Sequence, residues 1–105
     1  MSDINKVITA DDLLAYMGID YADDMVNKNI TRAIKTADGE LRESVGDNYP
    51  VEHPLTHELA LIYASSAYEN RDNVTLSGNE RKLADDYALK LRLYLRRSAN
   101  NEQKI

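Results

Sequence analysis

The stretch from Pro54 to Asn73 constrains the fold more than any other part of the sequence. At about 100° per residue, its apolar residues cover most of the circumference of a helix, and Glu58, Ser65 and Glu69 form only a narrow polar strip. Pro54 suits the first helical turn, where its missing N–H is no loss. A helix that is apolar on nearly all sides needs partners on more than one side. We therefore predict a central helix with the other segments packed around it.

A short helix is predicted near the start of the chain. Thr9 and Asp12 form a capping box, in which each side chain bonds to the backbone N–H of the other residue. The helix should run to Met17, where Gly18 suits the left-handed conformation that ends many helices. Residues 1–8 have no helical period, so we expect them to be flexible or to lie along the surface.

The clearest amphipathic helix follows. It begins near Asp20 or Asp23, because either carboxylate can cap a helix and face the positive end of its dipole. It should reach about Val45, ahead of Gly46 and a main loop over residues 46–54 that contains both prolines. Its apolar residues form one stripe: Val26, Ile30, Ala33, Ile34, Ala37, Leu41 and Val45.

The last helix is predicted from about Gly78 to Ser98, with residues 99–105 as a flexible tail. Leu89 and Leu93 lie one turn apart on the far side of this helix from its core stripe, among charged residues. The core stripe consists of Leu83, Ala84, Tyr87, Ala88, Leu91, Tyr94 and Leu95.

Together, the four segments predict an all-α fold, a compact four-helix domain around the central helix, without a sheet. At 105 residues, the chain has the size of a single domain, residues 1–105. It contains no cysteine, which excludes disulfides and thiolate metal sites. It has neither a basic, apolar leader nor an apolar run long enough to cross a membrane. We therefore expect a soluble intracellular protein without a membrane partner.

The charge is unevenly distributed along the chain. Residues 1–80 hold 15 acidic and 6 basic residues, a net charge of −9, whereas residues 81–105 hold 3 and 7, a net charge of +4. The overall charge of −5 argues against a protein that coats nucleic acid through its whole surface. The basic residues of the last helix could contact DNA phosphates, although a solvated basic face explains them more simply: Arg81, Lys82, Lys90, Arg92, Arg96 and Arg97.

No catalytic, cofactor-binding or metal-binding residues are predicted. His53 and His57 are four residues apart, but His53 precedes a proline and is disfavoured inside a helix, so loop and surface histidines are the simpler interpretation. Three pairs of aspartates fall near helix starts or on solvent faces, where helix-end electrostatics explains them. The sequence has no phosphate-binding glycine loop, catalytic triad or cofactor motif. We expect a protein that is not an enzyme and needs no cofactor.

The most unusual tetrapeptide, Tyr68-Glu69-Asn70-Arg71, stands at the end of the central helix. We expect a structural role for it: Tyr68 packs, Asn70 stops the helix through backbone hydrogen bonds, and Arg71 bonds the last carbonyls.

The same segment carries a family resemblance. Residues 67–72, Ala-Tyr-Glu-Asn-Arg-Asp, resemble the aromatic-Tyr-Glu-Asn-Arg-Glu signature of the bacteriophage head–tail connector family, also described as head completion proteins or DNA packaging adaptors. Ala67 stands where an aromatic residue is frequent. The Ile-Thr-x-x-Asp-Leu-Leu opening at residues 8–14 and the order of the helices are also similar, over roughly residues 8–97.

The resemblance implies a structural virion protein of a tailed phage or prophage, located at the head–tail junction and, before assembly, in the host cytoplasm. Its implied partners are further copies of itself in a closed ring with the twelve-fold symmetry of the portal, the portal protein, and a tail-side connector or stopper protein. Such a ring extends the DNA channel and stops DNA leaking from the filled head, and packaged DNA passes through without specific readout. Two alternatives stay open: a small helical DNA-binding or regulatory protein that uses the basic last helix, and a dimeric interaction module.

The outer side of the last helix is where we expect copies to meet. Leu89, Leu93 and Arg97 follow one another at helical spacing, and apolar residues ringed by charge suit the centre and rim of a protein contact. We therefore predict a head-to-tail subunit interface at these three residues. The alternative is that a neighbouring helix of the same chain covers both leucines.

Overall fold

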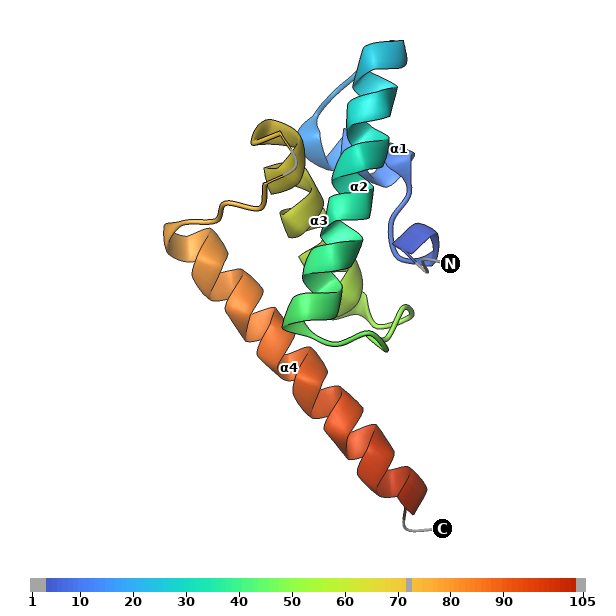
Figure 1. The fold of residues 1–105 in the computed structure, drawn as a ribbon, viewed down its shortest axis with the longest axis vertical. Coiled ribbons are helices and arrows are strands. Elements are labelled where there is room, and N and C mark those ends of the chain that lie inside the picture. Colours follow the sequence, from blue (N-terminus) through green and yellow to red (C-terminus); the bar gives the residue numbers. More distant parts are fainter. Residues whose placement is uncertain (1–3, 72, 104–105) are drawn as a thin grey trace.

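The computed structural model describes residues 4–71 and 73–103. These residues form four α-helices and one short 3-10 helix, without a strand, so the predicted all-α fold is confirmed. Figure 1 shows the arrangement of the helices, with the N-terminus beside α2 and the C-terminus at the far end of α4. In chain order the elements are η1 (Ile4–Lys6), α1 (Ala10–Met17), α2 (Asp24–Ser44), α3 (Pro54–Glu69) and α4 (Gly78–Gln103).

Helix α3 is the central helix, as predicted. It contacts α1, α2 and α4. The helix ends at Glu69, so the predicted extension to Asn73 is wrong; Asn70 ends it with hydrogen bonds described below. Nine of its 16 residues are buried: Thr56, Leu59, Ala60, Leu61, Ile62, Tyr63, Ala64, Ser66 and Ala67.

Helix α2 begins and ends close to the predicted positions. Asp23 is its N-cap, because the carboxylate accepts a hydrogen bond from the backbone N–H of Val26 at 2.8 Å. Val45 is the C-cap. The predicted apolar stripe faces the core, with Val26 partly buried and the remaining residues buried: Ile30, Ala33, Ile34, Ala37, Leu41 and Val45.

Helix α1 has both predicted end signals. The backbone N–H of Thr9 donates to the Asp12 carboxylate at 2.9 Å, and the N–H of Asp12 donates to the Thr9 hydroxyl at 3.1 Å. These two bonds are the capping box. The helix ends at Met17, and Gly18 follows with a φ of 72°, in the left-handed region.

The N-terminal segment packs on the core. We expected residues 1–8 to be flexible or superficial, and this is wrong from Ile4 onward; residues 1–3 lie outside the described part of the chain. Ile4, Val7 and Ile8 are buried, and η1 contacts α2. A single 3-10 turn is too short to show an apolar period in the sequence, although the turn and the two residues after it bring three apolar side chains to the core.

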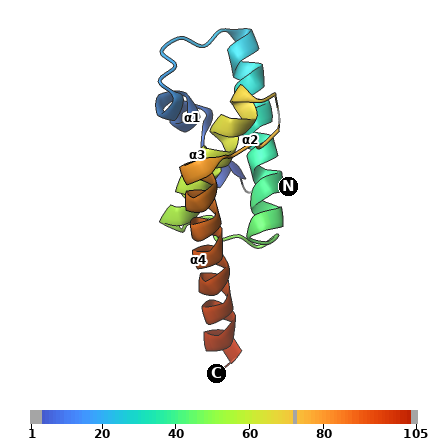
Figure 2. The same ribbon diagram turned by 90° about the vertical axis from the view of Figure 1, so that its left-hand side faces the viewer.

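Helix α4 leaves the body of the molecule. It contacts α3, whereas its second half projects beyond the other helices in both views (Figures 1 and 2). The molecule is accordingly elongated, with extents of 51, 31 and 19 Å along its principal axes. Ala84, Ala88 and Leu91 are buried on the side of α4 that faces the body.

Two predictions for α4 are wrong. The predicted core residues Leu83 and Tyr94 are each 44% exposed, because the body covers a narrower strip of α4 than the apolar spacing suggests. The helix also continues to Gln103, so the expected flexible tail over residues 99–105 is wrong as far as the structure describes it. Neither proline nor glycine interrupts the sequence after Ser98, so nothing local stops the helix there.

Candidate subunit-interaction site

The outer side of α4 carries the residues predicted to form a subunit contact. Leu89 is 46% exposed and Leu93 is 37% exposed, so no other helix in the described part of the chain covers them. At about 100° per residue they lie on the side away from the buried Ala84 and Leu91. Arg97, also exposed, stands one turn further along. The fold thus places Leu89, Leu93 and Arg97 in one row, termed here the α4 row.

The charged residues beside the α4 row are partly paired within the helix. Asp86 and Lys90 form an ion pair at 3.0 Å, and Arg81 and Asp85 form a longer one at 3.8 Å. Both pairs join residues four apart, the spacing at which side chains on a helix meet. All four side chains are well exposed, so water screens these pairs and they contribute little to stability.

Arg92 bonds to a backbone carbonyl of α2, whereas Arg81 and Lys90 pair with carboxylates of their own helix. Its Nη1 donates a hydrogen bond to the carbonyl oxygen of Ser44, at the end of α2, over 2.8 Å. A cation at the C-terminal end of a helix is favourable because that end carries the negative pole of the helix dipole. Arg96 and Arg97 lie further out, exposed, and neither forms an ion pair among the described residues.

The tetrapeptide at the end of α3 has its predicted structural role only in part. Asn70 stops the helix as predicted: its backbone N–H and its side-chain Nδ2 both donate to the carbonyl oxygen of Ser66, at 2.9 and 2.8 Å. Tyr68 is half-buried and packs against the core, whereas Glu69 is exposed. No hydrogen bond joins Arg71 to the last carbonyls of α3 among the described residues, so that prediction is wrong; Asn70 is the residue that donates to the Ser66 carbonyl.

Arg71 instead has an unusual backbone. Its φ of 53° lies in the left-handed region, and it is the one non-glycine residue with a positive φ in the described chain. This is the conformation that glycine usually provides after the last turn of a helix.

The hydroxyl of Ser66 holds the linker that follows α3. It accepts a hydrogen bond from the N–H of Thr75 at 2.9 Å and donates one to the carbonyl oxygen of Thr75 at 3.1 Å. Leu76, the next residue, is buried. These contacts return the linker to α3 and thereby fix where α4 begins. The sequence offered no sign of this role, because a serine inside a helix has many possible uses.

The end of α3 and the start of α2 together line a hollow of about 520 Å³. Among the described residues that line it, Glu69 is the single carboxylate, and none is a histidine or serine. The hollow can receive a side chain but lacks the groups of a hydrolytic or metal site. Its lining residues are Met25, Asn29, Arg32, Ala67, Tyr68, Glu69 and Arg71.

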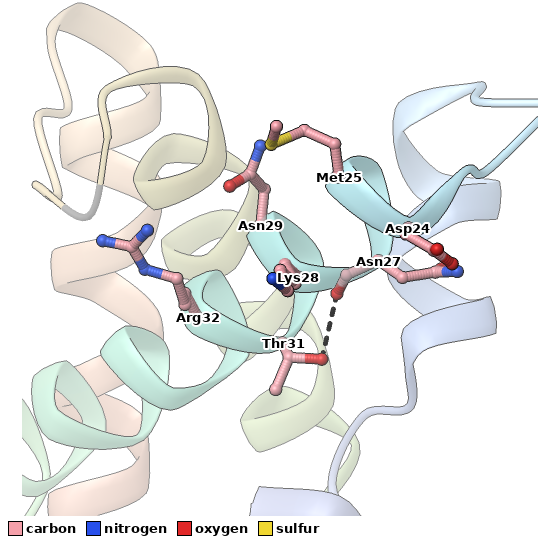
Figure 3. Close-up of a pocket in the computed structure, with 7 residues that line it drawn as sticks. All are labelled: Asp24, Met25, Asn27, Lys28, Asn29, Thr31 and Arg32. Carbon is pink, nitrogen blue, oxygen red and sulfur yellow. Dashed lines mark hydrogen bonds between the residues drawn. The ribbon is translucent and has the colours of Figure 1, made fainter.

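The first turns of α2 form a second, more open hollow (Figure 3). All of its lining residues come from this one helix, and the hydroxyl of Thr31 donates to the carbonyl oxygen of Asn27 at 3.0 Å. Such an open surface suits contact with a protein better than enclosure of a small ligand. The lining residues are Asp24, Met25, Asn27, Lys28, Asn29, Thr31 and Arg32.

Both histidines have structural contacts. His53 is the N-cap of α3, where its Nδ1 accepts a hydrogen bond from the N–H of Leu55 at 3.1 Å, and its ring meets that of Tyr94 edge-on with 4.7 Å between centroids. Nδ1 of His57 lies 2.9 Å from the carbonyl oxygen of Val7. Among the described residues, no group of three or more histidines and carboxylates is placed to hold a metal ion.

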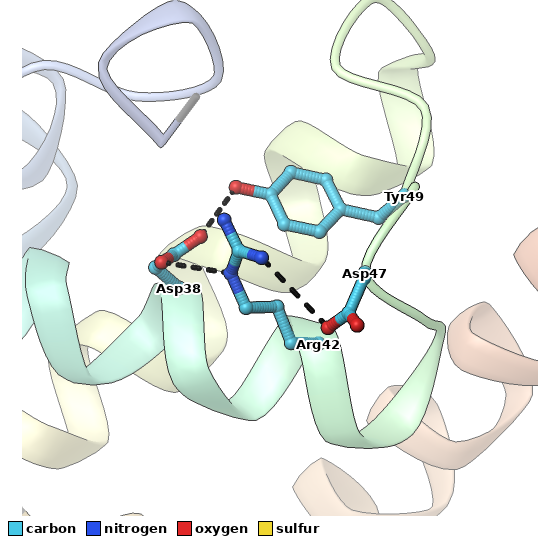
Figure 4. Close-up of polar contacts among 4 residues, drawn as sticks. All are labelled: Asp38, Arg42, Asp47 and Tyr49. Carbon is cyan, nitrogen blue, oxygen red and sulfur yellow. Dashed lines mark hydrogen bonds and ion pairs between the residues drawn. The ribbon is translucent and has the colours of Figure 1, made fainter. Parts of the chain in front are cut away.

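A buried carboxylate that sequence analysis missed fastens the main loop to α2 (Figure 4). Asp38 accepts a hydrogen bond from the Tyr49 hydroxyl at 2.6 Å and another from Nε of Arg42 at 3.1 Å. Nη1 of Arg42 also forms an ion pair with Oδ1 of Asp47, over 3.7 Å. The hydrogen bond to Asp38, and then its charge, raise the pKa of Arg42. The sequence offered one signal for this contact. Asp38 and Arg42 are four residues apart at the edge of the apolar stripe of α2, the spacing at which side chains on a helix meet.

Comparison with known proteins identifies no relative: no family model, curated protein or solved structure matches this chain. In the described part of the chain, no helix combines the length and the apolar character that crossing a membrane requires.

Proposed function

We propose that this protein is a structural component of a tailed phage or prophage, whose copies join head to tail in a ring below the portal and connect the head to the tail. The observation that carries the proposal is the α4 row. Leu89 and Leu93 are exposed on a helix whose second half projects from its own domain. Exposed leucines ringed by charge, on the side of the helix that faces away from its own domain, suit burial by a neighbouring subunit.

The family resemblance supports the same function. Its specific segment, residues 67–72, stands at the end of the central helix, and the helix order on which the rest of the resemblance depends is the order in the fold. A ring of this kind has no catalysis to perform. An acidic protein also suits a channel for DNA, because carboxylates repel the passing phosphates.

The test is assembly with the portal protein of the same phage. The wild-type chain should co-sediment with the portal in a fixed number of copies per portal. The Leu89→Asp/Leu93→Asp variant should keep the circular dichroism spectrum of the wild type, yet bind in at least about tenfold lower amount, because carboxylates would be buried at the centre of the contact.

Leu83→Asp is the matched control. Leu83 is 44% exposed, close to the 46% of Leu89, and lies on the same helix outside the α4 row. This variant should assemble like the wild type. A folded Leu89→Asp/Leu93→Asp variant that still assembles on portals and completes heads would rule out the α4 row as the subunit contact.

A DNA-binding role is the second candidate, favoured by the exposed Arg96 and Arg97. Phosphate contacts predict an affinity for duplex DNA that falls steeply as salt rises. Asp85 and Asp86 on the same helix weaken this candidate, because they pair with two of its cations. Salt-dependent binding that disappears in Arg96→Ala/Arg97→Ala but persists in Leu89→Asp/Leu93→Asp would favour it over the ring.

A further inference from the structure

Two further exposed apolar residues lie at the start of α2 and in the segment just before it. Tyr21 is 77% exposed and Met25 is 67% exposed, the highest values among the large apolar residues that the structure describes. Asp20, Asp23 and Asp24 are their neighbours in the chain and are also exposed. These five residues are termed the acidic corner. An apolar pair framed by carboxylates has the composition of a protein contact.

The acidic corner and the α4 row lie far apart in the molecule. Both views place the start of α2 at one end of the longest axis and the projecting half of α4 at the other (Figures 1 and 2). One chain therefore cannot bury its own α4 row in its own acidic corner. Two copies can.

The two patches are complementary in chemistry. Each has two exposed apolar side chains: Tyr21, in the segment before α2, with Met25 in its first turn, and Leu89 with Leu93 on one side of α4. The corner adds three carboxylates, whereas the projecting half of α4 adds two guanidinium groups without ion pairs among the described residues. A parallel contact between two α4 rows would bring their guanidinium groups together, whereas contact between a row and a corner brings opposite charges together.

The basic residues further along α2 limit the acidic surface. Lys28 and Arg32 follow Met25 by about one and two turns, on the same side of the helix. A basic helix that slid along α2 would meet these cations. The attractive surface is therefore confined to the first turn of α2 and the segment before it, which defines a register.

We infer that the acidic corner of one copy receives the α4 row of the next, with Leu89 and Leu93 against Tyr21 and Met25 and with Arg96 and Arg97 beside the aspartates. The inference rests on the proposed function, because that function requires copies of the chain to assemble. It adds the surface that receives the α4 row. Because the two surfaces differ and lie at opposite ends, each bound copy still presents one of each until the series closes on itself.

The experiment exploits the absence of cysteine from the chain, so that introduced thiols report the contact without background. Met25→Cys and Leu93→Cys are prepared as separate variants and oxidised under the conditions in which the wild type assembles, alone or on the portal. The mixture should give a disulfide-linked dimer, and neither variant should dimerise by itself. A chain with both substitutions should give a ladder of linked multimers.

Charge reversal provides a second measurement. Asp20→Lys/Asp24→Lys and Arg96→Glu/Arg97→Glu should each weaken assembly at least about tenfold, and a mixed assembly of the two should recover most of the loss. Asp23 is left unchanged because it caps α2. Lys35→Glu is the control, since this exposed residue lies further along α2, beyond the acidic corner and the two cations that limit it, and should not weaken assembly.

Two results would overturn the inference and leave the ring intact. One is dimerisation of the Leu93→Cys variant alone, which would mean that two α4 rows face each other. The other is normal assembly of Asp20→Lys/Asp24→Lys without any link between positions 25 and 93. Failure of the wild-type chain to assemble even with the portal is a distinct outcome, and it would overturn the proposed function together with the inference.

Discussion

Arg71 has a strained backbone conformation, and it also lines a hollow on the surface. Its φ of 53° costs a non-glycine residue about 1–2 kcal/mol. Its side chain lines the hollow between α2 and α3 with Tyr68 and Glu69. Strain of this kind persists only where the surrounding structure holds the backbone in place. The expected bonds from Arg71 to the last carbonyls of α3 are absent from the described structure, and the sequence does not reveal which residue after α3 takes the left-handed conformation.

Arg71→Gly should stabilise the protein by about 1 kcal/mol, because glycine adopts the left-handed region without the clash of a β-carbon. The measurement is the free energy of unfolding from urea titration. Arg71→Ala removes the same side chain but keeps the strain, and should not stabilise. Equal stability of the two variants would mean that the backbone at this position is not strained.

Glu40 should make stability depend on pH. Burial, and then the carboxylate of Glu43, raise the pKa of Glu40, while Arg81 opposes them. A carboxyl whose pKa is higher in the folded state contributes stability that is complete below the unfolded pKa, about 4.3, and is lost as pH rises through the folded pKa. Glu40→Gln should therefore be more stable than the wild type at pH 7, and this advantage should shrink toward pH 4.

The control for this pH dependence is Glu58→Gln, which removes one negative charge from the exposed strip of α3. Urea titrations of all three proteins at several pH values give the comparison. An advantage of Glu40→Gln that grows as pH falls would contradict the direction of the pKa shift.

At the scale of elements, the helices with local start and stop signals could be predicted from the sequence. Thr9, Gly18 and Asp23 act through hydrogen bonds and backbone angles within a few residues of themselves. The end of α4 could not be predicted in this way, because no local signal is present and a helix without a stop continues. The packing of η1 also depends on the surface of α2, which the sequence of η1 does not contain.

The candidate site was predictable to a similar extent. Helical angle alone placed Leu89 and Leu93 away from the core, and both are exposed. It could not reveal that Leu83 and Tyr94 are exposed too, because that depends on how much of α4 the body covers. The acidic corner was missed because a tyrosine between aspartates, in a segment between helices, has no period that distinguishes exposed from buried.

Tyr49→Phe should destabilise the protein by about 1–3 kcal/mol. The hydroxyl donates to the carboxylate of Asp38, which is 9% exposed and would lose one of its donors. Thermal or urea unfolding measures the loss. Asp47→Ala is the comparison, because its side chain is 88% exposed and its ion pair with Arg42 is long; it should change stability by less than about 0.5 kcal/mol. Equal losses in the two variants would mean that the loop is not fastened through Asp38.

On the scale of the whole molecule, the fold divides into a body and the projecting half of α4. The body has its core around α3, and among the side chains that the structure describes, Leu95 is the last apolar one of α4 that packs against this core. The side chains described beyond Leu95 are exposed or half-exposed. The projecting half therefore contributes surface to the molecule and little to its core.

A chain that ends after Leu95 should keep its free energy of unfolding within about 1 kcal/mol, because the side chains that the structure describes beyond this point are exposed or half-exposed. A chain that ends after Lys90 should lose roughly 2–5 kcal/mol, since it also lacks the fully buried Leu91. Urea unfolding compares the two truncations. Similar losses would show that the projecting half packs on the body.

Beyond Leu95, backbone hydrogen bonds within α4 are the principal support of the helix. Isolated helical segments shorter than about 12–15 residues are only marginally stable in water. Amide hydrogens in this part of the free protein should therefore exchange with solvent by local helix–coil fraying, well before the body opens, and protection should decline from Leu91 outward. A neighbour that binds this part of α4 must hold it in the helical form. The conformational entropy that the chain loses in doing so reduces the binding affinity. Slower amide exchange at the end of α4 would then indicate that a second copy has bound.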